Sequence, residues 1–257
     1  MQIKKILTLI TSLFLLVSVS SVIAQDSEEN DGLAQVVRIT AKAGHEKALE
    51  EAITNYHHYM GDKKGAFRFQ WYSIITGPDT GSYIARSGSH NWEDFDAKND
   101  WQEAASDKFA ADVQPHIASV VAMVTRTDQD LSSWPDSMEG YKYILLNNWQ
   151  IKQGQANAFN EGLKKIHETL QSGGWPNYYA FVRTVSGGHG NPILLVSPRK
   201  SYADMAPKEP KFIDVLNKAM GEEEAKTFLA EWSQTYKAGG YYTLQYLPKL
   251  SDYGQGK

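Results

Sequence analysis

The sequence predicts an α+β fold made of two similar β-α-β-β-α-β units, and three observations carry this prediction. A shift of 110 residues aligns 35–95 with 145–205 without a gap. Apolar residues recur at helical spacing after Gly44 and again after Gly154. Each helix is followed by two runs rich in aromatic and β-branched residues, joined by a glycine-containing turn. Similarity at a fixed distance along a chain indicates a tandem repeat.

The N-terminus has the pattern of an export signal. A short basic start precedes an apolar stretch from Ile6, and small residues lead to a cleavage site after Ala24. An uncleaved membrane anchor is the alternative, because residues 6–24 just reach spanning length. We expect residues 1–24 to be a signal peptide, 25–32 to be a flexible leader, and the mature protein to be periplasmic or secreted, with no membrane association after cleavage.

The first unit is expected over residues 33–128. Its apolar stripe at helical spacing and its hairpin turn Gly-Pro-Asp-Thr-Gly fix the order of its elements. These elements are a strand at 33–42, a helix after Gly44, strands at 67–76 and 82–89, a second helical region, and a strand near 120–127.

A linker at 129–140 separates the second unit, expected at 141–250, which is followed by a tail at 251–257. Its second helical region should be broken into pieces at Pro207, Pro210 and Gly221. Its other elements are strands at 141–151, 177–185, 193–197 and near 241–247, and a helix after Gly154.

The order β-α-β-β-α-β is that of a ferredoxin-like unit, an antiparallel sheet with both helices on one face. The strands carry bulky side chains on both faces, since Phe69 and Trp71 alternate with Tyr72. A strand with one face in water would instead alternate apolar with polar residues. We therefore predict that the two tandem units pack sheet to sheet.

This layout resembles the dimeric α/β-barrel superfamily, in which two such units pair sheet to sheet. The resemblance is carried by residues 44–49 (GHEKAL), 154–159 (GQANAF), 91–95 (NWEDF) and 201–205 (SYADM). It implies an intramolecular dimeric α/β barrel supplied by one polypeptide. The superfamily includes antibiotic-biosynthesis monooxygenases, stress-responsive barrel proteins, haem-degrading enzymes and proteins with no known activity, so the fold does not imply a function.

His57 and His167 are the candidate catalytic residues, because they occupy the same place in both repeats. At 100° per residue each lies at the border of the apolar stripe, where an imidazole could serve as an acid, a base or a ligand. The alternative is a partly buried histidine with a backbone hydrogen bond and no chemical role. No histidine pair has i,i+4 spacing, and we expect no metal.

The candidate ligand-binding residues lie on the strands. Arg38 and Asn148 occupy equivalent places in the first strand of each unit, where polar groups covered on both sides would contact a bound molecule. Aromatic side chains would line the same space between the sheets: Trp71, Tyr72, Tyr179 and Phe181. The doublet Arg199-Lys200 is expected on the solvated surface.

Some oxygenases of the dimeric α/β-barrel superfamily, which this chain resembles, use an asparagine of the first strand beside the ligand. The histidine that holds haem in that superfamily is not evident in this chain, and we expect no cofactor.

Composition excludes further functions. The chain of 257 residues has 26 Lys+Arg and 30 Asp+Glu, a formal charge of −4, which speaks against a nucleic-acid partner. It has no cysteine, which excludes disulfides, thiolate metal sites and thiol catalysis. A hydrophobic fraction of 42% is enough for a core.

Three functional hypotheses follow. The protein binds a small apolar or aromatic molecule between its two sheets; or it is a cofactor-independent monooxygenase or isomerase in which His57 or His167 handles a proton; or it is a structural or interaction module with a filled core. The sequence does not decide whether it is an enzyme, and it leaves homo-oligomer formation open.

Overall fold

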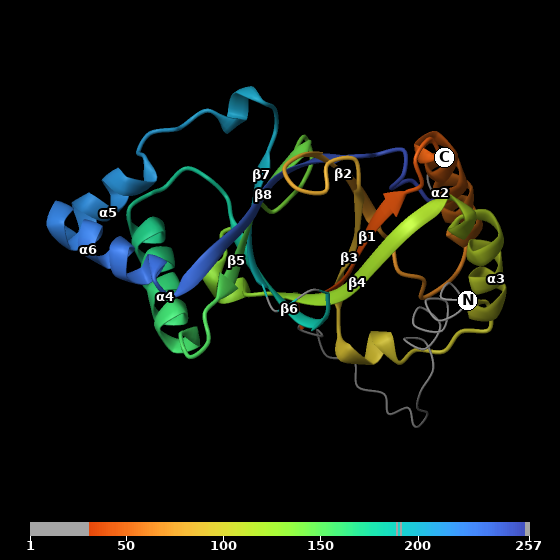
Figure 1. The fold of residues 1–257 in the computed structure, drawn as a ribbon, viewed down its shortest axis with the longest axis horizontal. Coiled ribbons are helices and arrows are strands. Elements are labelled where there is room, and N and C mark those ends of the chain that lie inside the picture. Colours follow the sequence, from red (N-terminus) through yellow and green to blue (C-terminus); the bar gives the residue numbers. More distant parts are fainter. Residues whose placement is uncertain (1–30, 189, 191, 255–257) are drawn as a thin grey trace. The chain divides into compact units, whose positions relative to one another are not determined.

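The computed structural model describes residues 31–188, 190 and 192–254 (Figure 1). The predicted signal peptide at 1–24 lies outside the described residues. Within them, eight strands form one antiparallel sheet: β1 (Leu33–Ala41), β2 (Gln70–Thr76), β3 (Tyr83–His90), β4 (Ile117–Thr127), β5 (Tyr143–Ile151), β6 (Ala180–Gly187), β7 (Pro192–Arg199) and β8 (Tyr236–Tyr246). Hydrogen bonds link them in the closed order β1-β3-β2-β8-β5-β7-β6-β4.

Five α-helices occur in the same part of the chain: α2 (Glu46–Met60), α3 (Gln102–Asp112), α4 (Ala156–Ser172), α5 (Phe212–Met220) and α6 (Glu222–Ser233). The α+β class and the antiparallel sheet confirm the coarse prediction. The packing of two tandem units sheet to sheet stays a prediction.

The predicted elements lie close to the observed ones, although β6 begins at Ala180 instead of residue 177 and β8 begins at Tyr236 instead of near residue 241. The strand β2 also starts late. This strand begins at Gln70 instead of residue 67, because the two preceding aromatic residues are held in other ways. The Phe67 ring stacks on His90 at 3.8 Å between ring centroids, and the backbone N–H of Phe69 donates to the Tyr253 hydroxyl at 2.8 Å.

The second helical region of the C-terminal half is broken where the sequence predicted. The short 3-10 helix Ala203–Met205 ends before Pro207, and α5 begins after Pro210. Gly221, with φ of 84°, separates α5 from α6. Proline and left-handed glycine both interrupt helical hydrogen bonding, which is the reason for these breaks.

Packing divides the chain into two compact units. The first comprises the described residues up to Trp71, Ile84–Val121 and those from Leu247 onward; the second comprises Tyr72–Tyr83 and the described residues of Ala122–Tyr246. In the first unit α2 buries a stripe that consists of Leu49, Ile53, His57 and Met60. The rings of Tyr56 and Phe109 meet edge to face at 5.3 Å and join α2 to α3.

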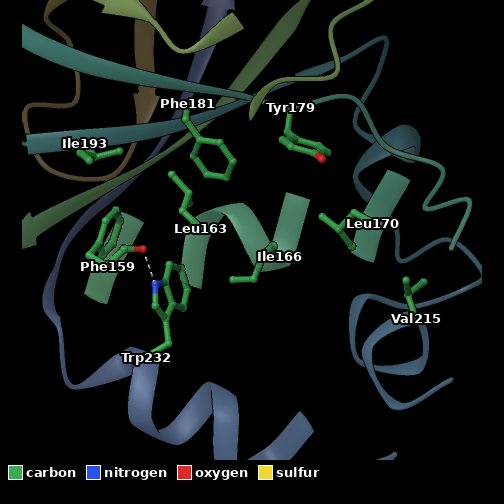
Figure 2. Packing of buried hydrophobic residues seen from close by; sticks show 9 residues of the cluster. All are labelled: Phe159, Leu163, Ile166, Leu170, Tyr179, Phe181, Ile193, Val215 and Trp232. Carbon is green, nitrogen blue, oxygen red and sulfur yellow. Dashed lines mark hydrogen bonds between the residues drawn. The ribbon is translucent and has the colours of Figure 1, made fainter. Parts of the chain in front are cut away.

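In the second unit, α4 packs against α5, α6 and the strands (Figures 1 and 2). Its core contains Phe159, Leu163, Ile166, Leu170, Tyr179, Phe181, Ile193, Val215 and Trp232. The indole N–H of Trp232 donates to the Phe159 carbonyl at 3.0 Å, as drawn in Figure 2. Gly162 makes room for this indole, because a Cβ there would lie 2.1 Å from Trp232 Cδ1.

None of the helices in the described part of the chain has the length and apolar character needed to cross a membrane.

Candidate functional site

His57 lies inside the buried stripe of α2, with 3% of its surface exposed, and not at the border that the sequence predicted. Its Nδ1–H donates to the Leu250 carbonyl at 2.6 Å, and its ring stacks on Tyr253 at 4.3 Å. Burial lowers the pKa of His57 to about 4, although the bond to Leu250 acts in the opposite direction. The C-terminal segment 247–254 covers this imidazole, which helical periodicity could not indicate.

His167 is half-buried on α4, and its Nδ1 lies 3.0 Å from the Tyr179 hydroxyl. Tyr179 is buried, and burial raises the pKa of its phenol. Figure 2 shows Tyr179 and Phe181 pointing toward α4, within the hydrophobic core. The two predicted lining residues therefore fill the space between helix and strands in their own unit.

Trp71 and His57 are also brought together, with 5.7 Å between ring centroids. The indole nitrogen of Trp71 is buried and has no hydrogen-bond partner among the described residues. Tyr72, the next residue, is half-buried, and its ring lies 5.5 Å from that of Tyr246.

Arg38 is half-buried on β1, in the first unit. Asn148 is half-buried on β5, in the second unit, and its side chain packs against the backbone at Gly239 of β8. Its amide oxygen Oδ1 is buried without a partner in the described part of the chain.

The second unit has a pocket of about 280 Å³ at the end of β7, which we call the Arg199 pocket. Its walls include Tyr141, Tyr178, Arg199, Lys200, Asp204 and Lys208. Arg199 is the last residue of the apolar strand β7, and 9% of its surface is exposed. The structure thus corrects the expectation that this arginine lies on the solvated surface.

The guanidinium of Arg199 is held at one nitrogen and unpartnered at another. Nη1 donates to the Ser197 hydroxyl at 2.6 Å and to the Pro198 carbonyl at 2.8 Å. Nε is buried and has no partner among the described residues. Burial lowers the pKa of Arg199, and the negative charge of Asp204 opposes this effect.

Asp204 is already engaged by other groups. The Lys208 ammonium contacts Oδ1 at 2.5 Å, and the backbone N–H of Lys200 donates to Oδ2 at 2.8 Å. Burial would raise the pKa of Asp204, but these hydrogen bonds hold it below its usual value. The carboxylate therefore stays ionised.

Two tyrosines supply the apolar wall. Their rings, Tyr141 and Tyr178, meet edge to face at 6.4 Å, and the Lys200 ammonium lies 5.2 Å from the Tyr141 centroid. Tyr178 is 41% exposed, so part of its ring is open to a visiting molecule.

A larger cavity of about 510 Å³ opens beside β6 and β7, with Arg183, Thr184 and Ile193 among its walls. The arginine of this cavity already has a partner, because Arg183 Nε donates a hydrogen bond to Asp128 Oδ2 at 2.5 Å. We therefore place the candidate site at the Arg199 pocket, where the guanidinium is held by a hydroxyl and a carbonyl and not by a carboxylate.

Sequence reasoning missed this pocket because its walls come from segments far apart, near 141, 176–178 and 198–208. The available signal was the run ILLVSPR, in which an arginine is the last residue of an apolar strand. The described residues contain no group of three or more His, Asp or Glu side chains placed to hold a metal ion.

No family model and no curated protein matches the chain. Solved structures do. An anthrone oxidase-like protein has 11% identity and a TM-score of 0.51, and the match covers 85% of this chain and 92% of that one. A proposed monooxygenase from Fusobacterium nucleatum subsp. nucleatum has 13% identity and a TM-score of 0.55, with coverage of 86% and 94%.

A chlorite dismutase from Candidatus Nitrospira defluvii, in complex with imidazole, has 9% identity and a TM-score of 0.50, with coverage of 87% and 95%. The fold is ferredoxin-like. At these identities the likeness extends to the ferredoxin-like fold alone, and the functional argument depends on the residues of this chain.

Proposed function

We propose that the protein is exported and binds a small molecule that contains an aromatic ring. The observation that carries the proposal is the Arg199 pocket, which an arginine and two tyrosines line together. Binding pockets are mostly apolar, with a few directed polar groups, and usually enclose about 300 to 1,000 Å³. A volume of about 280 Å³ suits a ligand with a single ring.

The core of the second unit is not a second ligand-binding site. Phe159, Trp232 and Phe181 fill the space between α4 and the strands with ring-to-ring contacts. A filled core stabilises the unit but offers no space for a ligand.

The alternative of a monooxygenase or isomerase lacks a comparable observation. Neither His57 nor His167 belongs to the walls of the Arg199 pocket. The activities named for the similar structures belong to those proteins, and export is proposed from the sequence of residues 1–24.

Expression of residues 1–257 in a bacterium tests both parts of the proposal. Mass spectrometry of the protein from the periplasmic or extracellular fraction should show cleavage after Ala24. Saturation-transfer NMR with a panel of neutral and charged single-ring aromatic compounds should then identify compounds that bind.

Tyr178→Ala and Tyr141→Ala should weaken this binding, because each removes one ring from the wall of the pocket. Tyr202→Ala is the matched control, since Tyr202 is a 58% exposed tyrosine of the same unit outside these walls. Binding of no compound by the folded wild-type protein, or equal losses in all three variants, would contradict the proposal.

A further inference from the structure

We infer that His45 and His116, two histidines of the first unit, together bind a divalent copper ion through their Nδ1 atoms, with water as the remaining ligands. These two nitrogens lie 3.0 Å apart. The residues are 71 positions apart in the chain, so the spacing rule that led us to expect no metal could not reveal them. The inference is independent of the Arg199 pocket, which lies in the second unit.

One residue holds the backbone of both histidines. The backbone N–H of Lys42 donates to the His116 carbonyl, and the backbone N–H of His45 donates to the Lys42 carbonyl, each at 2.9 Å. His45 directly precedes α2, and its carbonyl accepts the Leu49 N–H at 2.8 Å. Both side chains therefore start from a fixed frame between β1, α2 and β4, and a metal site held by regular elements is more precise than one on a free loop.

The second unit has the same frame without the histidines. The backbone N–H of Lys152 donates to the Thr235 carbonyl at 2.9 Å, and the backbone N–H of Gln155 donates to the Lys152 carbonyl at 3.0 Å. The backbone angles agree as well, since φ and ψ are −102° and 4° at His45 and −102° and 6° at Gln155. The frame thus forms without imidazoles, and folding does not explain why the first unit carries two of them.

The distance between the two nitrogens suits copper. Metal–nitrogen bonds of about 2.0 to 2.1 Å to nitrogens 3.0 Å apart enclose an angle of about 90 to 100° at the metal. This angle is typical of adjacent ligands in the square-planar and tetragonal complexes of Cu²⁺, and it is smaller than the tetrahedral angle of structural Zn²⁺ sites. Imidazole is a good ligand for copper, and Cu²⁺ binds most tightly among the divalent ions of the first transition row.

Both imidazoles can present a lone pair to the ion. The two nitrogens are close enough for an N–H···N hydrogen bond, in which one ring carries its proton on Nδ1. Copper binding requires that this proton move to Nε2 of the same ring, which frees both Nδ1 lone pairs and leaves the charge of each ring unchanged. His45 is exposed and His116 half-buried, so the rings can turn toward one ion. The nearby Lys42 ammonium is bonded to the Pro115 carbonyl at 2.5 Å, and the carboxylate of Glu46, next to His45 in the chain, offsets its charge.

Isothermal titration of the untagged product of residues 1–257 with Cu²⁺, Zn²⁺ and Mg²⁺ tests the inference. We expect Cu²⁺ to bind more tightly than Zn²⁺, and we expect no binding of Mg²⁺ at this site, because Mg²⁺ prefers oxygen ligands. His45→Gln and His116→Thr introduce the residues that the second unit carries on the same frame. Each should weaken Cu²⁺ binding at least about 10-fold, since even the loss of an outer partner of a metal ligand typically costs about 10- to 100-fold. His58→Gln removes an exposed histidine of the same unit and should leave the affinity unchanged.

NMR of the wild-type protein supplies a measurement that does not depend on the folding of any variant. Because Cu²⁺ is paramagnetic, a small amount should broaden the imidazole resonances of His45 and His116 before those of His58. Broadening that begins at other histidines, or equal Cu²⁺ affinity in the wild type, His45→Gln and His116→Thr, would overturn the inference. Tighter binding of Zn²⁺ than of Cu²⁺ would overturn the assignment of copper.

Discussion

His57 makes the first unit sensitive to mild acid. Its imidazole is buried and donates to the Leu250 carbonyl, and burial lowers its pKa from the usual 6.5 to about 4. A group whose pKa is lower in the folded than in the unfolded state contributes stability above its unfolded pKa. This contribution is lost as the pH falls toward the folded pKa. The relevant window runs from pH 6.5 down to pH 4.

The size of the effect follows from the two pKa values. At pH 5 an unfolded histidine lies 1.5 pH units below its pKa of 6.5 and is mostly protonated, while the folded one is still mostly neutral. One pKa unit corresponds to about 1.4 kcal/mol, so the protein should lose ~2 kcal/mol between pH 7 and pH 5 through this residue.

Urea unfolding followed by tryptophan fluorescence at pH 7 and pH 5 measures the loss. His57→Gln keeps an N–H donor near Leu250 but does not titrate, so its loss between the two pH values should be smaller by ~2 kcal/mol. His58→Gln, on the exposed side of the same helix, should behave as the wild type. If His57→Gln loses as much stability as the wild type, the burial argument is wrong.

Three further predictions concern packing. Gly162→Ala should destabilise the protein by about 1 to 3 kcal/mol in urea unfolding, because the new methyl group would overlap Trp232; an unchanged midpoint would contradict the packing. Trp232→Phe should cost about 1 kcal/mol, because it removes the indole N–H that donates to the Phe159 carbonyl; no loss in thermal unfolding would contradict that bond. Tyr253→Phe should speed hydrogen exchange at the Phe69 amide, and unchanged protection would show that the hydroxyl is not its acceptor.

Local patterns were sufficient for the elements of this protein. The apolar spacing after Gly44 and Gly154 placed α2 and α4, and Pro207, Pro210 and Gly221 placed the breaks around α5 and α6. These features depend on neighbours within a few residues, which a sequence displays directly. The predicted tandem repeat and the export signal stay predictions from the same kind of pattern.

His57 and His167 show what local sequence patterns could not predict, namely the surroundings of a side chain. Both occupy the same helical position, yet one is buried beneath the segment 247–254 and the other is half-buried beside Tyr179. The partner of His57 is Leu250, 193 residues away along the chain, and the partner of His167 is Tyr179, 12 residues away. Helical periodicity describes neighbours within one helix and therefore carries no information on either contact.

The sequence by itself determined the α+β class, the order of helices and strands, and the residue types able to build a core. Only the tertiary structure decided which polar side chains are buried. Arg199 belongs to a charged doublet in the sequence, but it lines a pocket with Tyr141 and Tyr178 once distant segments meet. The physical reason is that burial, and with it the cost of an unsatisfied donor, depends on contacts across the fold.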